Sequence, residues 1–178
     1  MIQLEYFEEK DFKDLMDWIP SAEFLLQWGG PQFVFPLTKD QLHDYIKHAN
    51  LHDSETYIYK AKDSVTRKMI GHISLNKVDR KNRSARIANV LIGDKASRGK
   101  GMGKVMVNEL LPIAFEEWKL HRVSLGVFDF NQSAIHCYEK VGFKKEGLLR
   151  ECRKIGGEYW NLLEMSILED EWKALSYK

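Results

Sequence analysis

The chain has 178 residues, of which 44% are hydrophobic and 30% are charged, and its 27 Lys and Arg nearly balance its 26 Asp and Glu. These values predict a soluble, cytoplasmic protein with a single domain over residues 1–178, and the formal net charge of +1 argues against nucleic acid as a partner. No apolar run approaches the roughly eighteen residues that a membrane span needs, and no cluster of His, Cys and carboxylates predicts a metal site.

The first half of the chain predicts a strand, three helices and then three strands joined by polar turns. The expected helices lie over residues 9–19, 22–28 and 39–50, and the expected strands over residues 2–7, 56–61, 69–78 and 85–92. Thr38 precedes the third helix as a candidate N-cap. Successive strands with short polar turns predict hairpins, and hence antiparallel pairing.

The second half of the chain alternates helices with strands. Helices are expected over residues 101–118 and 133–141, and strands over residues 123–128, 143–153 and 160–168. Pro112 should interrupt the first helix because proline has no N–H to donate, and Gly142 should end the second. This order predicts an α+β fold, with a mixed and mostly antiparallel sheet flanked by helices.

A glycine-rich loop over residues 98–104 connects the strand 85–92 to the helix that begins near Gly101. Its sequence is Arg98-Gly99-Lys100-Gly101-Met102-Gly103-Lys104. Glycines let the backbone come close to a ligand, and the first N–H groups of a helix point outward unpaired. Together with the helix dipole and three basic side chains, these donors predict an anion site that suits a diphosphate.

Two common phosphate-binding loops do not fit residues 98–104. The mononucleotide loop Gly-x-x-x-x-Gly-Lys-Ser/Thr would need glycine in place of Arg98 and Ser or Thr in place of Val105. The dinucleotide fingerprint Gly-x-Gly-x-x-Gly would need glycine in place of Lys104 or Met106. ATP and NAD are therefore not the expected ligands.

A second motif follows the strand 123–128, and the two motifs together point to one family. Residues 131–143 read Asn-x-x-Ala-x-x-x-Tyr-x-x-x-Gly-Phe, and the loop reads Arg-x-x-Gly-x-Gly from Arg98 to Gly103. In this order, separated by one helix and one strand, the motifs resemble the GNAT N-acetyltransferase superfamily. Asn131 and Tyr138 are seven residues apart and therefore lie on one face of their helix.

The resemblance implies an acetyl-CoA-dependent N-acetyltransferase in which a primary amine attacks the thioester directly. It implies that the cofactor is bound by Val90, Leu91, Ile92, Arg98, Gly99, Lys100, Gly101, Met102, Gly103, Lys104, Asn131, Ser133 and Tyr138. Backbone N–H groups around Val90 and Leu91 would polarise the thioester carbonyl, and Tyr138 would protonate the leaving thiolate. The acceptor would be a protein N-terminus or a small-molecule amine, and residues 90–94 and 157–168 resemble the RimJ/RimL-like branch.

The chain departs from the family at the general base. Many members carry a glutamate on a strand before one of the two motifs, whereas Gly126 stands where such a residue is expected here. Glu23, or water held by Ser74 and Asn89, is the candidate replacement. Because no base is evident, a non-catalytic acyl-CoA-binding sensor or scaffold of the same fold is the alternative.

The acceptor is expected to lie against the aromatic, glycine-rich stretch 24–33. Its candidate binding residues are Trp28, Phe33, Asn89 and Trp160. The sequence leaves open which amine is the acceptor, whether acyl groups other than acetyl are used, and whether the protein is a monomer or a homodimer.

Overall fold

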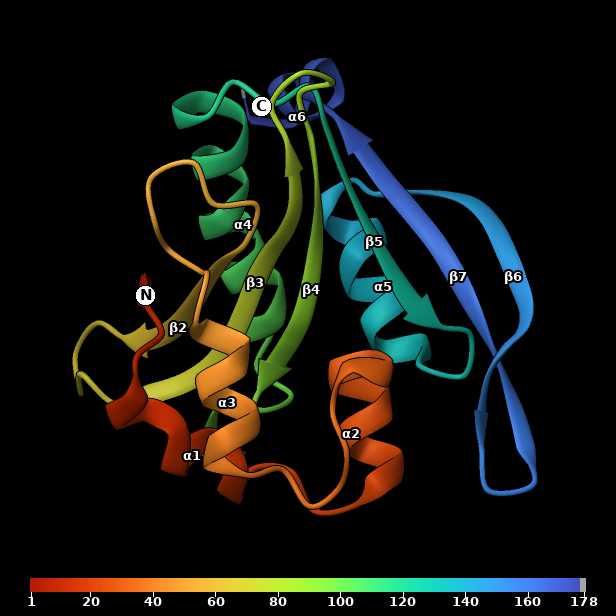
Figure 1. Cartoon of the computed structure of the whole chain (residues 1–178). Coiled ribbons are helices and arrows are strands. Elements are labelled where there is room, and N and C mark those ends of the chain that lie inside the picture. Colours follow the sequence, from red (N-terminus) through yellow and green to blue (C-terminus); the bar gives the residue numbers. More distant parts are fainter. Residues whose placement is uncertain (177–178) are drawn as a thin grey trace.

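A mixed sheet organises residues 1–176, the range that the computed structural model describes (Figure 1). Seven strands in this range lie in the order β1-β2-β3-β4-β5-β7-β6. They are β1 (Ile2–Tyr6), β2 (Tyr57–Asp63), β3 (Met69–Asp79), β4 (Ser84–Ile92), β5 (Arg122–Phe128), β6 (Lys144–Ile155) and β7 (Glu158–Leu168). Neighbouring strands are antiparallel except β4 and β5, which run parallel. The expected mixed, mostly antiparallel sheet is confirmed.

Helices cover both faces of this sheet. They are α1 (Phe12–Asp17), α2 (Ala22–Gly29), α3 (Lys39–Ile46), α4 (Met102–Pro112), α5 (Gln132–Val141) and α6 (Glu169–Ser176). Successive side chains of a strand point to opposite faces. Along β2, Ile58 joins the apolar cluster of α1, α2 and α3, whereas Tyr57 and Tyr59 join the cluster of α4 and α5. The first three helices therefore cover one face and α4 and α5 the other, as Figure 1 shows. Within the described range, no helix combines the length and apolarity needed to cross a membrane.

Capping and helix-breaking residues act where the sequence predicts. Thr38 Oγ1 accepts a hydrogen bond from the N–H of Gln41 at 3.3 Å, and Gly142 ends α5 at a left-handed φ of 114°. Pro112 is the last residue of α4, and the chain continues as a π-helical turn over Ile113–Glu117. Proline has no N–H to donate to the carbonyl of Asn108, so the α-helical bonding is interrupted at Pro112.

Two helix predictions were incomplete, and one helix was missed. The helix expected over residues 9–19 consists of a 3₁₀ turn over Glu9–Asp11 followed by α1, and the one expected over residues 39–50 ends at Ile46. The missed helix is α6, which opens with three acidic residues that favour a helix N-terminus. Its Trp172 packs on Phe115 with ring centroids 5.3 Å apart, so a contact distant in sequence stabilises a short helix.

The sheet opens between β4 and β5. These strands pair only from Ser84 opposite Arg122 to Ile87 opposite Leu125. Beyond that point β5 stays with β7, whereas β4 stays with β3. Figure 1 shows the two strands diverging toward α2. The last residues of both strands therefore lack each other as hydrogen-bonding partners.

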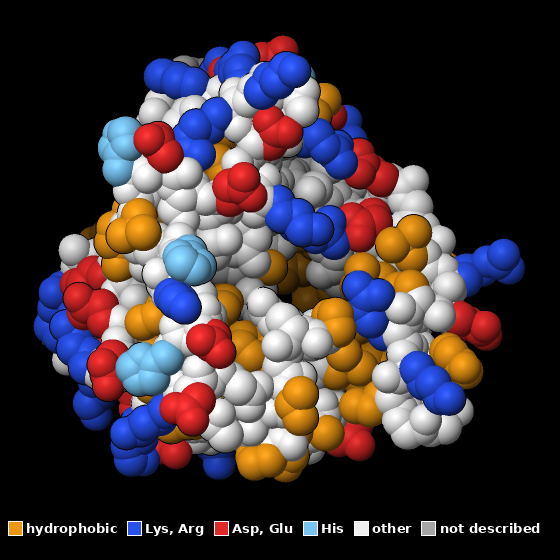
Figure 2. Space-filling view, viewed as in Figure 1, with side chains coloured by type: hydrophobic (Ala, Val, Ile, Leu, Met, Phe, Trp, Pro, Cys, Tyr) orange, Lys and Arg blue, Asp and Glu red, His pale blue; other side chains and the backbone are white. Residues whose placement is uncertain are grey.

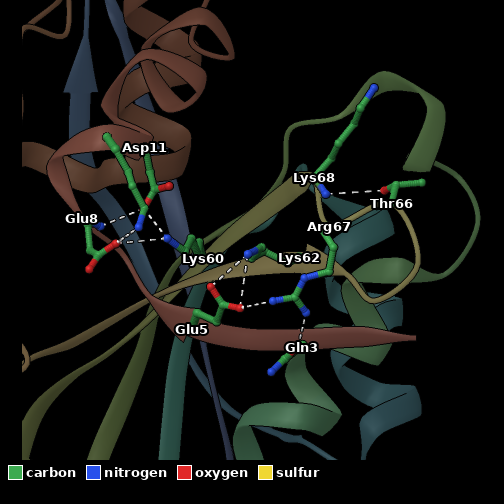
Figure 3. Close-up of polar contacts among 10 residues, drawn as sticks. Gln3, Glu5, Glu8, Asp11, Lys60, Lys62, Thr66, Arg67 and Lys68 are labelled. Carbon is green, nitrogen blue, oxygen red and sulfur yellow. Dashed lines mark hydrogen bonds and ion pairs between the residues drawn. The ribbon is translucent and has the colours of Figure 1, made fainter.

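A set of ion pairs stabilises the edge of the sheet that β1 and β2 form, away from the opening between β4 and β5 (Figure 3). Lys60 is buried, and its ammonium lies 2.8 Å from a carboxylate oxygen of Asp11. Glu5 binds Lys62 at 3.1 Å and Arg67 at 2.9 Å. Burial of a lysine is tolerated because a carboxylate pairs with it, and these contacts tie the first helical turn and the turn after β2 to the strands.

Candidate active site

The opening between β4 and β5 forms a cleft of about 740 Å³. Figure 2 shows the molecule hollowed over this region, with hydrophobic side chains inside the hollow and charged side chains at its rim. The sequence-predicted residues that line the cleft are Trp28, Asn89, Val90, Leu91, Ile92, Arg98, Gly99, Gly101, Met102, Gly103, Lys104, Asn131, Ser133 and Tyr138. The fold thus gathers residues from four distant segments around one cavity.

The glycine-rich loop presents unpaired backbone donors to this cleft. Gly99 and Gly101 adopt left-handed φ values of 73° and 75°, which glycine adopts without strain. Gly101 is the N-cap of α4, and the first helical bond joins the N–H of Val105 to the Gly101 carbonyl at 3.2 Å. The N–H groups of residues 102–104 therefore precede the helical bonding pattern and are free to bind an anion.

The basic residues of the loop have different roles. The Arg98 guanidinium donates to the carbonyls of Ile92 at 2.9 Å and Gly93 at 3.1 Å, so it folds the loop onto the end of β4. Lys104 lines the cleft, whereas Lys100 is exposed and lies outside its lining. Lys100 was also expected to bind the cofactor, and its backbone directly precedes the N-cap Gly101.

Tyr138 is the buried phenol of the cleft. It lies on α5 with 7% of its surface exposed. Burial raises the pKa of Tyr138, so the hydroxyl is protonated throughout the physiological range. None of the hydrogen bonds within residues 1–176 uses this hydroxyl, which leaves its proton available to a bound molecule. Burial also raises the pKa of neighbouring Cys137, and a protonated thiol is a poor nucleophile.

Asn131 lies at the junction of β5 and α5. Its Oδ1 accepts a hydrogen bond from the N–H of Ala134 at 3.2 Å and so caps the helix. The amide nitrogen of its side chain has no hydrogen-bond partner among residues 1–176 and is free to contact a ligand in the cleft. Ser133 lies in the first turn of the same helix and is exposed on the cleft wall.

The acceptor-side aromatics lie at two depths. Trp28 lines the cleft, while Phe33 stacks behind it with ring centroids 5.4 Å apart. Trp160 packs against Phe128 at 5.0 Å, and Phe128 rather than Trp160 reaches the cleft. Phe33 and Trp160 therefore support the lining instead of forming it. Phe24 and Gln27, which lie in the stretch expected to face the acceptor, also line the cleft, whereas sequence reasoning missed Phe128 at the end of β5.

Gly126 is explained by the arginine beside it. The Arg86 guanidinium pairs with the Glu164 carboxylate through contacts of 2.6 and 2.8 Å. A Cβ at position 126 would lie 2.4 Å from Arg86 Nη2. The place where a catalytic glutamate was considered is therefore occupied by an ion pair.

The proposed bases are not placed for proton transfer from a bound amine. Glu23 is exposed in the first turn of α2 and lies outside the described lining of the cleft. Asn89 is buried, and its Oδ1 accepts hydrogen bonds from Ser74 at 3.0 Å and Tyr45 at 3.2 Å. The expected water-holding pair of Ser74 and Asn89 is therefore a closed contact between side chains.

Comparison with known proteins gives this geometry a context. The model of the Acetyltransferase (GNAT) family matches residues 22–143. The chain is 31% identical over 134 residues to spermidine N(1)-acetyltransferase of Vibrio cholerae, covering 75% of each protein. It is 24% identical over 152 residues to an aminoglycoside N(6')-acetyltransferase type 1 of Klebsiella pneumoniae, covering 82% of this chain and 75% of that protein.

A solved structure extends the likeness over nearly the whole chain. It is spermidine N-acetyltransferase from Vibrio cholerae in complex with CoA and spermine, with a TM-score of 0.83, 27% identity, and coverage of 97% of this chain and 98% of that one. These relatives do not support the expected RimJ/RimL-like branch, because they are similar over most of their length and are named for small-molecule amines. The sequence motifs that suggested that branch are short segments of the shared fold.

The cofactor loop, the parted strands and these relatives agree. This chain belongs to the GNAT family of acetyltransferases and is an acetyl-CoA-dependent N-acetyltransferase.

Proposed function

We propose that the chain transfers the acetyl group of acetyl-CoA to a primary amine of a small molecule, by direct attack of the amine in the cleft between β4 and β5. One observation carries this proposal: the β4–β5 pairing ends at Ile87, and the α4 N-terminus and Tyr138 open into the resulting cleft. A ligand that reaches from the α4 N-terminus to the parted strands would place its reactive end beside Tyr138.

The residues around α4 and α5 suit two parts of acetyl-CoA, its pyrophosphate and its polar arm. The backbone N–H groups of residues 102–104, the helix dipole and Lys104 would hold the pyrophosphate. The Asn131 amide nitrogen and Ser133 line the path toward the strands and would contact the polar arm. Acetyl-CoA itself supplies the acyl group as an activated thioester.

Backbone N–H groups of β4 would polarise the thioester carbonyl. Beyond Ile87, β4 has no partner in β5, and residues 87–92 line the cleft. N–H groups of Val90 and Leu91 that point away from β3 would donate to the thioester oxygen, on which negative charge grows during attack. Fixed donors in a partly dehydrated cleft stabilise this charge without reorganising water.

Tyr138 would give a proton to the departing sulfur. A thiol with an ordinary pKa near 8.5 is mostly protonated at neutral pH, so the departing thiolate needs a donor. The Tyr138 hydroxyl is protonated, buried and unused by the described part of the chain. No carboxylate side chain among residues 1–176 lines the cleft, so the amine would lose its proton to water rather than to an aspartate or glutamate.

This assignment favours amines that are easily deprotonated. Deprotonating an amine of pKa about 10.4 at neutral pH costs about 4.6 kcal/mol, whereas an amine of pKa about 7.7 costs about 1 kcal/mol. The relatives named for spermidine nevertheless make a polyamine the first acceptor to test, although its alkylamines are of the kind that costs more to deprotonate. The second is an amine with an apolar body and one positive charge, because Phe24, Trp28 and Phe128 line the acceptor side.

Gln27 offers a way to separate these acceptors. It lines the cleft, and Gln27→Glu adds a negative charge with almost no change in volume. Charge attraction across a partly exposed cleft should raise kcat/KM for spermidine relative to a monoamine by about tenfold at low salt. Glu23→Gln is the control, because Glu23 lies on the same helix outside the cleft lining.

The proposal is tested by CoA release from acetyl-CoA, measured as free thiol, with a panel of polyamines, monoamines, amino acids and aminoglycosides. Amine-dependent release that Tyr138→Phe reduces supports transfer. Tight acetyl-CoA binding without release on any amine would instead support the sensor or scaffold reading.

A further inference from the structure

Five hydrogen bonds from three elements converge on Asn89 of β4. The Asn89 carbonyl accepts from Trp28 Nε1 at 2.9 Å and from His72 Nδ1 at 3.0 Å. Its Oδ1 accepts from the hydroxyls of Ser74 at 3.0 Å and Tyr45 at 3.2 Å. Its Nδ2 donates to the Trp28 carbonyl at 3.4 Å. We call these five residues the Asn89 network; they tie α2, α3 and β3 to one position on β4.

The network holds a strand irregularity. His72 lies opposite Leu91 and Ser74 opposite Ala88, so two residues of β4 oppose one residue of β3. Asn89 adopts a left-handed φ of 54°, which asparagine tolerates better than most residues. This is a β-bulge, and its carbonyl accepts side-chain donors instead of taking part in the ladder.

The bulge directly precedes the two residues of β4, Val90 and Leu91, whose N–H groups are proposed to bind the thioester. The last β4–β5 pair is at Ile87, and Val90 and Leu91 follow the bulge along the cleft wall. A rotation at Asn89 redirects the N–H groups of these two residues. The direction of these N–H groups therefore depends on the backbone conformation at Asn89.

Burial of His72 is the unusual feature of this network. The ring is fully buried, and its Nε2 has no hydrogen-bond partner within residues 1–176. Because Nδ1 faces a carbonyl, it carries the proton, and burial lowers the pKa of His72 to about 4. The rings of Phe7 and Trp28 pack against it with centroids 4.9 and 5.4 Å away. A buried acceptor without a partner, such as Nε2, lowers stability. The same ring supplies the Nδ1–H donor that binds the Asn89 carbonyl.

We infer that the Asn89 network positions the Val90 and Leu91 amides for the thioester carbonyl, and couples the acceptor-side helices α2 and α3 to them. This inference rests on the proposed function. Trp28 belongs both to the cleft lining and to the network. An acceptor that packs on α2 would therefore contact the side chain that donates a hydrogen bond to the Asn89 carbonyl. The members of the network other than Trp28 and Asn89 are positioning residues that act through Asn89.

The test removes two donors and leaves the packing. Tyr45→Phe with Ser74→Ala deletes both hydroxyls that bind Asn89 Oδ1. We expect kcat to fall by about tenfold or more, while KM for acetyl-CoA changes by less than about twofold. Asn89→Gly, which keeps a left-handed backbone accessible but removes the side-chain bonds, should show the same loss of kcat.

Tyr57→Phe is the matched control. Tyr57 is buried on β2 of the same sheet, and its hydroxyl bonds the Leu51 carbonyl at 3.1 Å and Arg80 at 2.9 Å, outside the cleft. Thermal midpoints of all variants allow activity to be compared at equal folded fraction. An equal fall in kcat for Tyr57→Phe, or an unchanged kcat in the double variant, would overturn the inference. Failure of the wild-type chain to release CoA with any amine would instead overturn the proposed function.

Discussion

Removal of the Tyr138 hydroxyl is the most direct perturbation of the proposed chemistry. Tyr138→Phe retains the ring, which packs against Phe143 with centroids 6.0 Å apart. The described chain forms no hydrogen bond to this hydroxyl, so its loss should change the free energy of unfolding by less than about 0.5 kcal/mol. A positioned acid contributes roughly 10²–10⁴ to a rate. We therefore expect kcat to fall at least about 100-fold, which corresponds to about 2.7 kcal/mol of transition-state stabilisation.

The assay is steady-state CoA release at varied acetyl-CoA and amine, with thermal unfolding as the stability control. A loss confined to kcat, with KM for acetyl-CoA and the thermal midpoint unchanged, fits loss of a proton donor. Because the pKa of Tyr138 is raised, its acid form persists as the pH rises, and it is lost only above the ordinary range for tyrosine. The wild-type rate should therefore rise with pH as the amine deprotonates, with no fall up to about pH 9. A variant that keeps kcat within about twofold would show that water or another group protonates the sulfur.

Three further predictions concern two glycines of the cleft and an ion pair between β5 and β6. Gly101→Ala forces alanine into a left-handed φ of 75°; it should destabilise the fold by about 1–2 kcal/mol and weaken CoA binding in calorimetry about tenfold. Gly126→Ala places a Cβ 2.4 Å from Arg86 Nη2, and by disturbing that guanidinium it should lower stability in denaturant by about 1–3 kcal/mol. The Arg122 hydrogen bond lowers the pKa of Glu146 to about 2, so this carboxylate stabilises the fold above its unfolded pKa and loses that contribution as pH falls toward 2. Glu146→Gln should cost under about 1 kcal/mol at neutral pH, because the pair is partly exposed, and the difference from wild type should shrink below pH 4.

The order of strands and helices was predictable because its signals are local. Helix periodicity, the Thr38 cap, the Pro112 break and the Gly142 cap each act within a few residues of their own position. Helix α6 escaped prediction because its stability depends on Trp172 packing against Phe115, a contact between distant segments. The observed ends of α1 and α3 differ from the expected ones for the same reason. The last turn of a helix frays easily, and contacts with other parts of the chain decide where it ends.

The cleft lining contributed by residues 98–104 and 131–138 was predictable for a related reason. Residues 98–104 and 131–143 are each continuous in sequence, so the spacing of glycines, Asn131 and Tyr138 states the geometry directly. The side chains of this loop are harder to place from spacing, because Lys100 and Lys104 are both exposed and only Lys104 lines the cleft. Spacing along a chain identifies which backbone passes the ligand, but not which side chains turn toward it.

The acceptor half depends on contacts that no local pattern contains. Trp28 and Asn89 are 61 positions apart and meet through two hydrogen bonds, and Arg86 and Glu164 are 78 apart and exclude a side chain at position 126. Asn89 was expected to bind the substrate; it lines the cleft, and its side-chain oxygen also accepts hydrogen bonds from Tyr45 and Ser74 at the bulge. Asn89 would therefore act on the reaction through the backbone of β4. Substitutions on α2 or α3 that leave every cleft-lining side chain in place should still alter kcat, because they change the hydrogen bonds to Asn89.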